Sequence, residues 1–349
     1  MVIEWRRTRA DRTRARRRGR HARNPRSAPF DSRHTPIAPA PKDDARRARH
    51  RAHAHVPLPA ILLIVGSVLL FTILDATIKI LTQRYSVPVL VWARYGVQAV
   101  AMMLWLLPQM GTALLRTRRL GMHLARAAIL PFSSVCFFSS LKYLPLAEAT
   151  AINYSTPVLV VILAVIFLHE RMTQPRIALV VAGIAGMLLI VRPGSAVFQG
   201  AALLAMGAAV FYATFQILTR KLASEDSRVL LFYPAFVGTL MLSAVLPWYG
   251  IDFAIPWTDA ALIVGAGLLG TLGHFLFILA FQRAPASGLT PYTYIHLVWA
   301  TIAGWIIFGS FPDAWTLAGM AVITGSGLLI ALHERRRAKS APPEPTAVD

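Results

Sequence analysis

Three charged residues stand inside long apolar stretches of the sequence: Asp75, Lys79 and Arg94. An ionisable group in hydrocarbon costs about 2.5–3.5 kcal/mol on insertion scales, so each is a functional candidate by default. Asp75 and Lys79 are four residues apart, on one face of a helix, where they can pair. Arg94 needs a carboxylate or carbonyl partner at such a depth. We interpret all three as binding or proton-responsive groups that face a cavity. The alternative is that they only hold helices together.

A second group of candidates lies later in the chain. Tyr292, His296 and Trp299 fall at positions i, i+4 and i+7, which form one stripe of a helix. Aromatic rings beside an imidazole suit a planar or cationic ligand, through stacking and cation–π contacts. Histidine can also exchange protons near neutral pH. Tyr154 is a further polar candidate, and the alternative for the whole group is a packed helix interface.

The composition indicates the solvent in which these residues must work. Of 349 residues, 56% are hydrophobic and 15% are charged, whereas a soluble domain carries about 25% charged residues. The single cysteine, Cys136, excludes an intrachain disulfide. We find no HExxH, GxSxG or phosphate-binding loop, which disfavours an enzyme, and we expect no cofactor. The composition predicts an all-α integral membrane protein.

Ten apolar runs are long enough to cross a bilayer as helices. They cover residues 58–81, 88–108, 122–142, 147–168, 175–192, 198–218, 228–249, 258–281, 288–309 and 314–332. Prolines and glycines interrupt several of them, which bilayer helices tolerate.

The cations in the loops predict the orientation of these spans, because Lys and Arg concentrate on the cytoplasmic side. With the N-terminus inside, the inner loops and their edges hold ten cations: Arg116, Arg118, Arg119, Arg126, Arg171, Arg176, Arg220, Lys221, Arg228 and Arg283. The outer loops hold three: Arg84, Lys142 and Arg192. We therefore expect a multi-pass inner-membrane protein with both termini in the cytoplasm.

Both ends of the chain are polar. Residues 1–55 hold 17 Lys and Arg against 5 Asp and Glu, and we interpret them as a disordered basic cytoplasmic tail. A misassigned start, with translation from near Val56, is an alternative. Binding to nucleic acid is not expected, since aromatic residues suited to base stacking are not interleaved with the cations. Residues 333–349 are predicted to be a second cytoplasmic tail.

Two stretches of the sequence repeat each other: "PLAEATAINYSTPV" from Pro145 and "PASGLTPYTYIHLV" from Pro285. A step of 140 residues relates Tyr154 to Tyr294, and a step of 137 relates "ILTQR" at Ile80 to "ILTRK" at Ile217. The chain therefore divides into two repeats, residues 58–192 and 198–332. Each has five spans, so the second repeat crosses the membrane in the opposite direction. Inverted repeats of this kind are typical of secondary transporters, which bind their substrate near the midplane between the repeats.

The stretch "EATAINYSTPVLVVILAVIFLHERMT", from Glu148 to Thr173, resembles the EamA domain of the drug/metabolite transporter superfamily. The resemblance extends over both repeats and implies ten spans. It also implies a cytoplasmic gate at Glu170 and Arg171. The second copy departs from the pattern, with Leu297 in place of the proline and Ser310-Phe311-Pro312-Asp313 in place of Glu-Arg-x-Thr. This departure weakens the expectation of a second clasp.

The second copy is also similar to a subgroup that includes S-adenosylmethionine uptake carriers. The resemblance implies a secondary transporter that moves a small organic metabolite across the bacterial inner membrane by alternating access. The substrate classes left open are an amino acid, S-adenosylmethionine, riboflavin and a drug-like solute. The alternative is a structural or channel-like membrane protein without substrate coupling. Proton or exchange coupling and a homodimer are both compatible with this architecture.

Overall fold

The computed structural model describes residues 56–111, 114, 117, 119–168, 173–192, 199–222, 225–249, 255–284 and 286–340. Within these residues the fold is helical, without a β-strand. The predicted tail of residues 1–55 lies outside them, as does the chain beyond residue 340.

The predicted spans are confirmed as helices, to within a few residues at most ends. The first repeat contains α2 (Leu58–Leu81), α3 (Val87–Met110), α4 (Leu120–Leu141), α5 (Leu146–Asn153), α6 (Thr156–Leu168) and α7 (Gln174–Val191). The second contains α8 (Gln199–Lys221), α9 (Ser227–Val245), a short 3-10 turn η2 (Leu246–Trp248), α10 (Trp257–Arg283), α11 (Ala286–Thr293), α12 (Ile295–Phe308) and α13 (Ala314–Ser340). Prolines mark several starts, because a helix does not need the N–H of its first residues.

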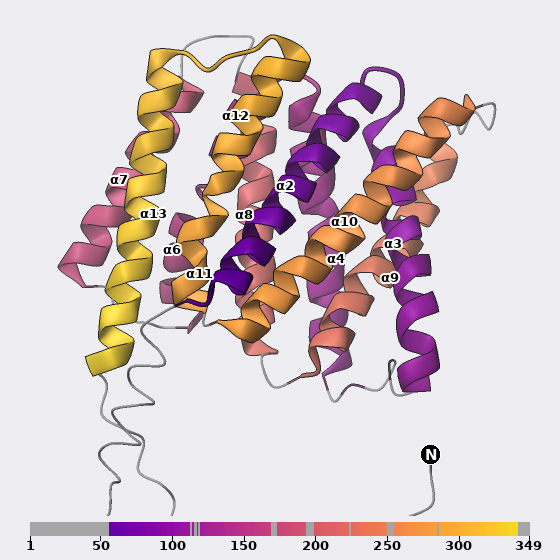
Figure 1. The fold of residues 1–349 in the computed structure, drawn as a ribbon, viewed down its shortest axis with the longest axis horizontal. Coiled ribbons are helices and arrows are strands. Elements are labelled where there is room, and N and C mark those ends of the chain that lie inside the picture. The colour runs from indigo at the N-terminus through magenta and orange to yellow at the C-terminus, as the bar shows by residue number, and fades with distance from the viewer. Residues whose placement is uncertain are drawn as a thin grey trace, which may run out of the picture. The chain divides into compact units, whose positions relative to one another are not determined.

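Nine of the ten spans are long and apolar enough to cross a membrane within the described residues. The remaining span, predicted over 288–309, consists of α11 and α12, which have 8 and 14 residues. α13 is longer than predicted and continues to Ser340. Figure 1 shows that α2 begins, and α13 ends, at the same end of the bundle, as an even number of spans requires.

The packing of the helices follows the inverted repeat. α2 packs against α10, and its counterpart α8 packs against α4. In the same way the pair α3 and α10 is matched by α9 and α4, and the pair α2 and α12 by α8 and α6. Counterparts also meet each other, as α3 with α9 and α7 with α13, and the fourth and ninth spans meet through α5 and α12. The contacts of α3 with α9 and of α7 with α13 lie where a pseudo-twofold axis relates the repeats.

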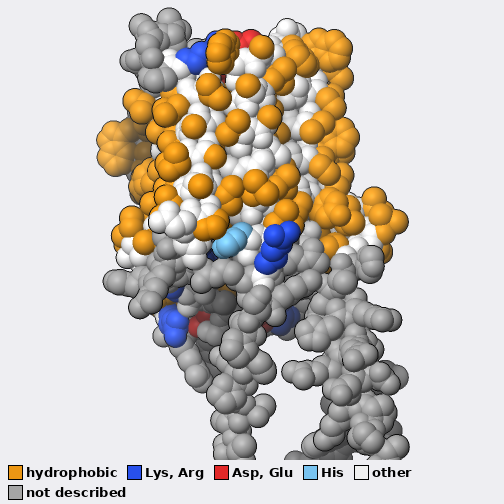
Figure 2. Space-filling view, turned by 90° about the vertical axis from the view of Figure 1, so that its left-hand side faces the viewer, with side chains coloured by type: hydrophobic (Ala, Val, Ile, Leu, Met, Phe, Trp, Pro, Cys, Tyr) orange, Lys and Arg blue, Asp and Glu red, His pale blue; other side chains and the backbone are white. Residues whose placement is uncertain are grey.

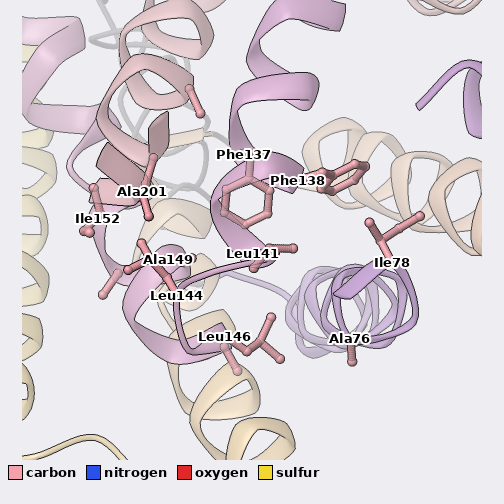
Figure 3. Close-up of a cluster of buried hydrophobic side chains, with 14 of the residues drawn as sticks. Ala76, Ile78, Phe137, Phe138, Leu141, Leu144, Leu146, Ala149, Ile152 and Ala201 are labelled. Carbon is pink, nitrogen blue, oxygen red and sulfur yellow. The ribbon is translucent and has the colours of Figure 1, made fainter. Parts of the chain in front are cut away.

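The largest cluster of buried apolar side chains extends over most helices of the bundle, including α2, α4, α5 and α8. Figure 3 shows part of it: Ala76, Ile78, Phe137, Phe138, Leu141, Leu144, Leu146, Ala149, Ile152 and Ala201. The outer surface is apolar too. In Figure 2, hydrophobic side chains cover the middle of the face that carries α7 and α13, and charged side chains lie at its margins. A surface of this kind is stable only against hydrocarbon.

Two cations that we counted among the inner loops are buried instead. Arg126 and Arg176 are each 5% exposed. The Arg126 guanidinium donates to Thr219 Oγ1 at 2.6 Å and to the Leu230 carbonyl at 2.7 Å, so it joins α4 to α8 and α9. Without these two residues, eight inner cations still face three outer ones, and the predicted orientation is unchanged.

Glycines let α10 approach its neighbours closely. A Cβ atom on Gly267 would lie 2.5 Å from the Cβ of Val97 in α3, and one on Gly273 would lie 2.8 Å from the Phe71 ring in α2. A hydroxyl reinforces this contact, since Ser67 donates to the Gly273 carbonyl at 2.8 Å. Small residues at helix interfaces are the usual means of tight packing in membranes.

Gly267→Ala should therefore lower the thermal stability of the purified protein. Backbone would have to shift around Val97, at a cost of about 1–3 kcal/mol in the free energy of unfolding. The control is Gly265→Ala in the same helix, where an added Cβ meets nothing within 4 Å. Both changes gain the same helix propensity, so equal melting temperatures for the two variants would contradict the packing described.

Candidate functional site

The fourth and ninth spans are each interrupted near the middle of the bundle. The fourth breaks at Tyr154 and Ser155, between α5 and α6. Pro157 is the second residue of α6, where its missing N–H could not continue the hydrogen bonds of α5 across the break. The ninth breaks at Tyr294, between α11 and α12. Leu297 stands in the place of the proline there, and Pro291 inside α11 accompanies the break.

The two breaks face each other. The Tyr154 hydroxyl donates to the Thr293 carbonyl at 2.7 Å. The Tyr154 ring lies 5.3 Å from that of Tyr294 and 5.7 Å from that of His296. Tyr294 was not among our site candidates, although the 140-residue step pairs it with Tyr154. The repeat was thus the signal that could have found it.

Asp75 and His296 form a buried acid–imidazole pair between α2 and α12. Asp75 is 6% exposed and His296 is 9% exposed. The His296 Nε2 atom lies 3.7 Å from Asp75 Oδ2. That distance allows an ion pair but is too long for a hydrogen bond.

Lys79 contacts other partners than Asp75. Its Nζ atom donates to the carbonyl of Leu141 at 2.5 Å and to that of Leu144 at 2.7 Å, and it lies 5.4 Å from the centre of the Phe308 ring. The spacing allowed Lys79 to pair with Asp75. Lys79 instead binds the carbonyls at and just after the end of α4, where the partial negative charge of a helix C-terminus attracts a cation. Lys79 thus joins α2 to α4, toward the outer end predicted for the bundle.

Arg94 lies in α3 and contacts α4 and α10. Its guanidinium donates to Ser134 Oγ at 3.2 Å and covers the Tyr95 ring at 4.4 Å. A Cβ on Gly270 would lie 3.4 Å from its Nη1 atom. The Nε atom of Arg94 is buried without a hydrogen-bond partner among the described residues.

Several polar atoms around the two breaks lack a hydrogen-bond partner within the described part of the chain. They are Asn153 Oδ1, Ser155 Oγ, Tyr294 Oη, His296 Nε2 and Trp299 Nε1. A buried polar atom without a partner costs about 1–3 kcal/mol, so such atoms gather where a ligand or water supplies the partner. Over the described residues, no cluster of His, Cys, Asp and Glu could hold a metal ion.

The remaining candidates lie elsewhere. The break at Tyr294 interrupts the predicted stripe, and Tyr292 packs near the inner end with Ile64, Phe281 and Leu289. Trp299 stays on one face with His296, a turn further along α12. Glu170 and Arg171 lie outside the described residues.

A clasp joins α7 to α13 at each end. At one end Arg192 donates to both carboxylate oxygens of Asp313, and the Thr316 N–H donates to Asp313 at 2.9 Å. At the other, Thr173 Oγ1 lies 3.4 Å from His333 Nε2. Asp313 occupies the position of Thr173 in the second repeat, at a step of 140. The second repeat thus has an ion pair at the position where the first has a threonine–histidine contact.

Tyr154→Phe should lower the free energy of unfolding by about 1–2 kcal/mol, because the buried Thr293 carbonyl would lose its donor. Tyr294→Phe is the matched control, since its hydroxyl has no partner among the described residues. Thermal unfolding in detergent measures both. A Tyr294→Phe variant as unstable as Tyr154→Phe would contradict the assigned roles.

The Arg192–Asp313 clasp should persist at neutral pH. Hydrogen bonds from Arg192 and from the Thr316 N–H hold the pKa of Asp313 below its usual range. A depressed carboxyl pKa adds stability above the unfolded value of about 4, which is lost as the pH falls through the folded value. Asp313→Asn should thus lower the melting temperature equally from about pH 5 to pH 8. Arg192→Ala should match it, and a difference that vanishes near pH 6 would contradict this.

Comparison with known proteins agrees with this architecture. A crystal structure superposes on the chain with a TM-score of 0.56 at 18% identity, over 80% of this chain and 98% of the other. This likeness concerns the fold alone.

Relatives with known roles are also similar. An S-adenosylmethionine uptake transporter of Rickettsia conorii is 31% identical, over 65% of this chain and 76% of the relative. A riboflavin transporter of Vibrio cholerae is 25% identical, over 82% and 97%. The pseudopaline exporter CntI of Pseudomonas aeruginosa is 28% identical, over 75% and 92%. The profile of the EamA-like transporter family matches residues 58–192 and 199–332. The chain is a multi-pass inner-membrane secondary transporter of small metabolites, and it belongs to the EamA-like transporter family.

Proposed function

We propose that the substrate binds where the two interrupted spans face each other, and that the repeats open this site to either side in turn. The unpartnered polar atoms around the breaks carry this proposal, together with the buried Asp75–His296 pair. Asp75, His296, Tyr154 and Trp299 supply charge and aromatic rings to one region. Arg94 lies beyond Asp75 on the neighbouring helices.

Lys79 and Tyr292 stand to either side of this region, toward the predicted outer and inner ends. We assign them to the two approaches, with Glu170 and Arg171 as the cytoplasmic gate. The carrier acts without catalysis in this proposal.

The substrate we propose is S-adenosylmethionine or a closely related sulfonium amino acid. Its sulfonium and ammonium groups suit Asp75, its carboxylate suits Arg94 and its adenine suits the tyrosine and tryptophan rings. Riboflavin is uncharged at neutral pH and would leave a buried acid and a buried guanidinium without function. The charges of Asp75 and Arg94 therefore favour S-adenosylmethionine over riboflavin, in keeping with the similarity to the Rickettsia carriers.

Orientation and coupling are part of the same proposal. The excess of loop cations at the end where α2 begins and α13 ends supports a cytoplasmic location of both termini. His296 next to Asp75 can exchange a proton when a cationic group displaces it, so proton coupling and substrate exchange share one site. A homodimer is compatible with this arrangement and is not required by it.

Counterflow in proteoliposomes tests the substrate. Vesicles loaded with S-adenosylmethionine should accumulate the labelled compound. S-adenosylhomocysteine, which lacks the sulfonium charge, should compete about tenfold less well, equivalent to about 1.4 kcal/mol. Riboflavin should compete weakly. Equal competition by all three compounds would exclude recognition of the sulfonium charge by Asp75. Failure of counterflow with S-adenosylmethionine would exclude this compound as the substrate.

Substitutions test the residues. Asp75→Asn, Arg94→Ala and His296→Ala should each lower transport by about tenfold or more while the protein still reaches the membrane, because a buried charge contact is worth at least 1.4 kcal/mol. Lys79→Ala should also impair transport. Arg283→Ala, which removes an exposed cation at the end of α10, is the control. Wild-type flux in Asp75→Asn, Arg94→Ala and His296→Ala would make these residues structural.

A further inference from the structure

Helices α7 and α13 touch closely at one end of their length. A Cβ on Gly319 would lie 2.6 Å from the Gly186 carbonyl oxygen, so the two backbones are in direct contact there. Gly186 precedes Arg192 by six residues and Gly319 follows Asp313 by six. This close contact therefore lies on the side of the Arg192–Asp313 clasp.

Toward the other end the two helices border an open surface hollow of about 360 Å³. Its walls include Ala178 and Leu179 of α7 and Leu329 and Leu332 of α13, and His333 and Arg336 stand along its α13 side. We call it the α7–α13 groove. The hollow lies between this close contact and the contact of Thr173 with His333 at the other end of the two helices.

The groove opens to the outside of the bundle rather than to the site at the broken spans. Ala178, Leu329 and Leu332 are exposed, although all are apolar. Figure 2 faces this side of the molecule, with an apolar band and, at its lower margin, a histidine beside a basic side chain. An apolar hollow in a surface that faces hydrocarbon is filled by lipid chains.

The end of the groove is cationic. Arg336 is exposed on the last turns of α13, next to the half-buried His333. The sequence adds Arg335, Arg337 and Lys339 within residues 333–340, against one acid, Glu334. Since α13 remains helical to Ser340, this segment continues from the apolar band toward the polar headgroups.

We propose that the α7–α13 groove binds one anionic phospholipid, with an acyl chain along Leu179 and Leu329 and its phosphate at Arg336 and His333. A guanidinium binds a phosphate through two parallel hydrogen bonds. The ammonium of a zwitterionic headgroup would meet Arg336 with like charge, so phosphatidylglycerol is favoured over phosphatidylcholine. A bound lipid would fill the α7–α13 groove beside the contact between Thr173 and His333.

Lipid retention by the full-length protein tests the headgroup. The protein would be equilibrated with equal amounts of phosphatidylglycerol and phosphatidylcholine in nanodiscs, then extracted in mild detergent, and its retained lipid measured by mass spectrometry. Phosphatidylglycerol should dominate. Arg336→Ala should lower its retention about fivefold, as expected for about 1 kcal/mol per cation near a lipid surface. Excess inorganic phosphate should not displace it.

Arg283→Ala is the control, because it removes an exposed cation at the same end of the bundle, outside the groove. If Arg283→Ala and Arg336→Ala lowered the retention of phosphatidylglycerol equally, general surface charge would explain the retention, and the proposal would be overturned. Equal retention of the two lipids by the wild type would overturn it as well.

A second pair of variants tests the apolar part. Ala178→Phe would fill the groove and should lower retention about as much as Arg336→Ala. Val181→Phe adds the same ring to an exposed position of α7 outside the groove, and should leave retention unchanged. Retention that survives Ala178→Phe, or that falls equally in Val181→Phe, would show that no lipid chain occupies the groove.

Discussion

A helix can be interrupted inside a bilayer only where protein satisfies the backbone groups that the break releases, since each unsatisfied group in hydrocarbon costs several kcal/mol. This chain meets that requirement by setting its two breaks against each other. The Tyr154 hydroxyl donates to the Thr293 carbonyl, directly before the second break. The breaks therefore stabilise one another at the pseudo-twofold axis. They also collect polar atoms at a depth where the rest of the bundle has little to offer a solute, which is why the candidate site lies there.

The fold is nearly symmetric, but its chemistry is not. The 137-residue step relates Asp75 to Tyr212, and the 140-residue step relates His296 to Thr156. The acid–imidazole pair between α2 and α12 thus has an uncharged counterpart between α8 and α6. The clasps differ in the same way, with an ion pair at one end and a Thr–His contact at the other. Such differences give the inward-open and outward-open conformations of the carrier different free energies. They also define one binding orientation for a solute in an otherwise symmetric bundle.

Sequence patterns predicted the helices well because hydropathy over twenty residues is a strong signal and few alternatives exist in a bilayer. The partners of the charged residues were harder to predict. The spacing of Asp75 and Lys79 indicates only that they share a helix face. The neighbour that each contacts depends on where α4 and α12 pack, and a local sequence pattern does not predict this packing. Tyr292 shows the same limit, since a stripe drawn over an unbroken helix fails once Tyr294 interrupts it. Arg126 was assigned to a loop by its place near a span end, although it lies inside the bundle.

Alternating access requires some contacts to persist and others to break. The pairs α2–α10 and α4–α8 have the character of persistent contacts: glycines bring α10 close to its neighbours, and one buried serine hydroxyl in each pair bonds a carbonyl of the other helix, Ser67 to Gly273 and Ser133 to Ala208. The clasps between α7 and α13 are different. Arg192 and Asp313 are about half exposed, and exposed ion pairs contribute little to stability. Two conformations that differ mainly in such contacts stay within a few kcal/mol of each other, close enough for a bound solute to decide which one is populated.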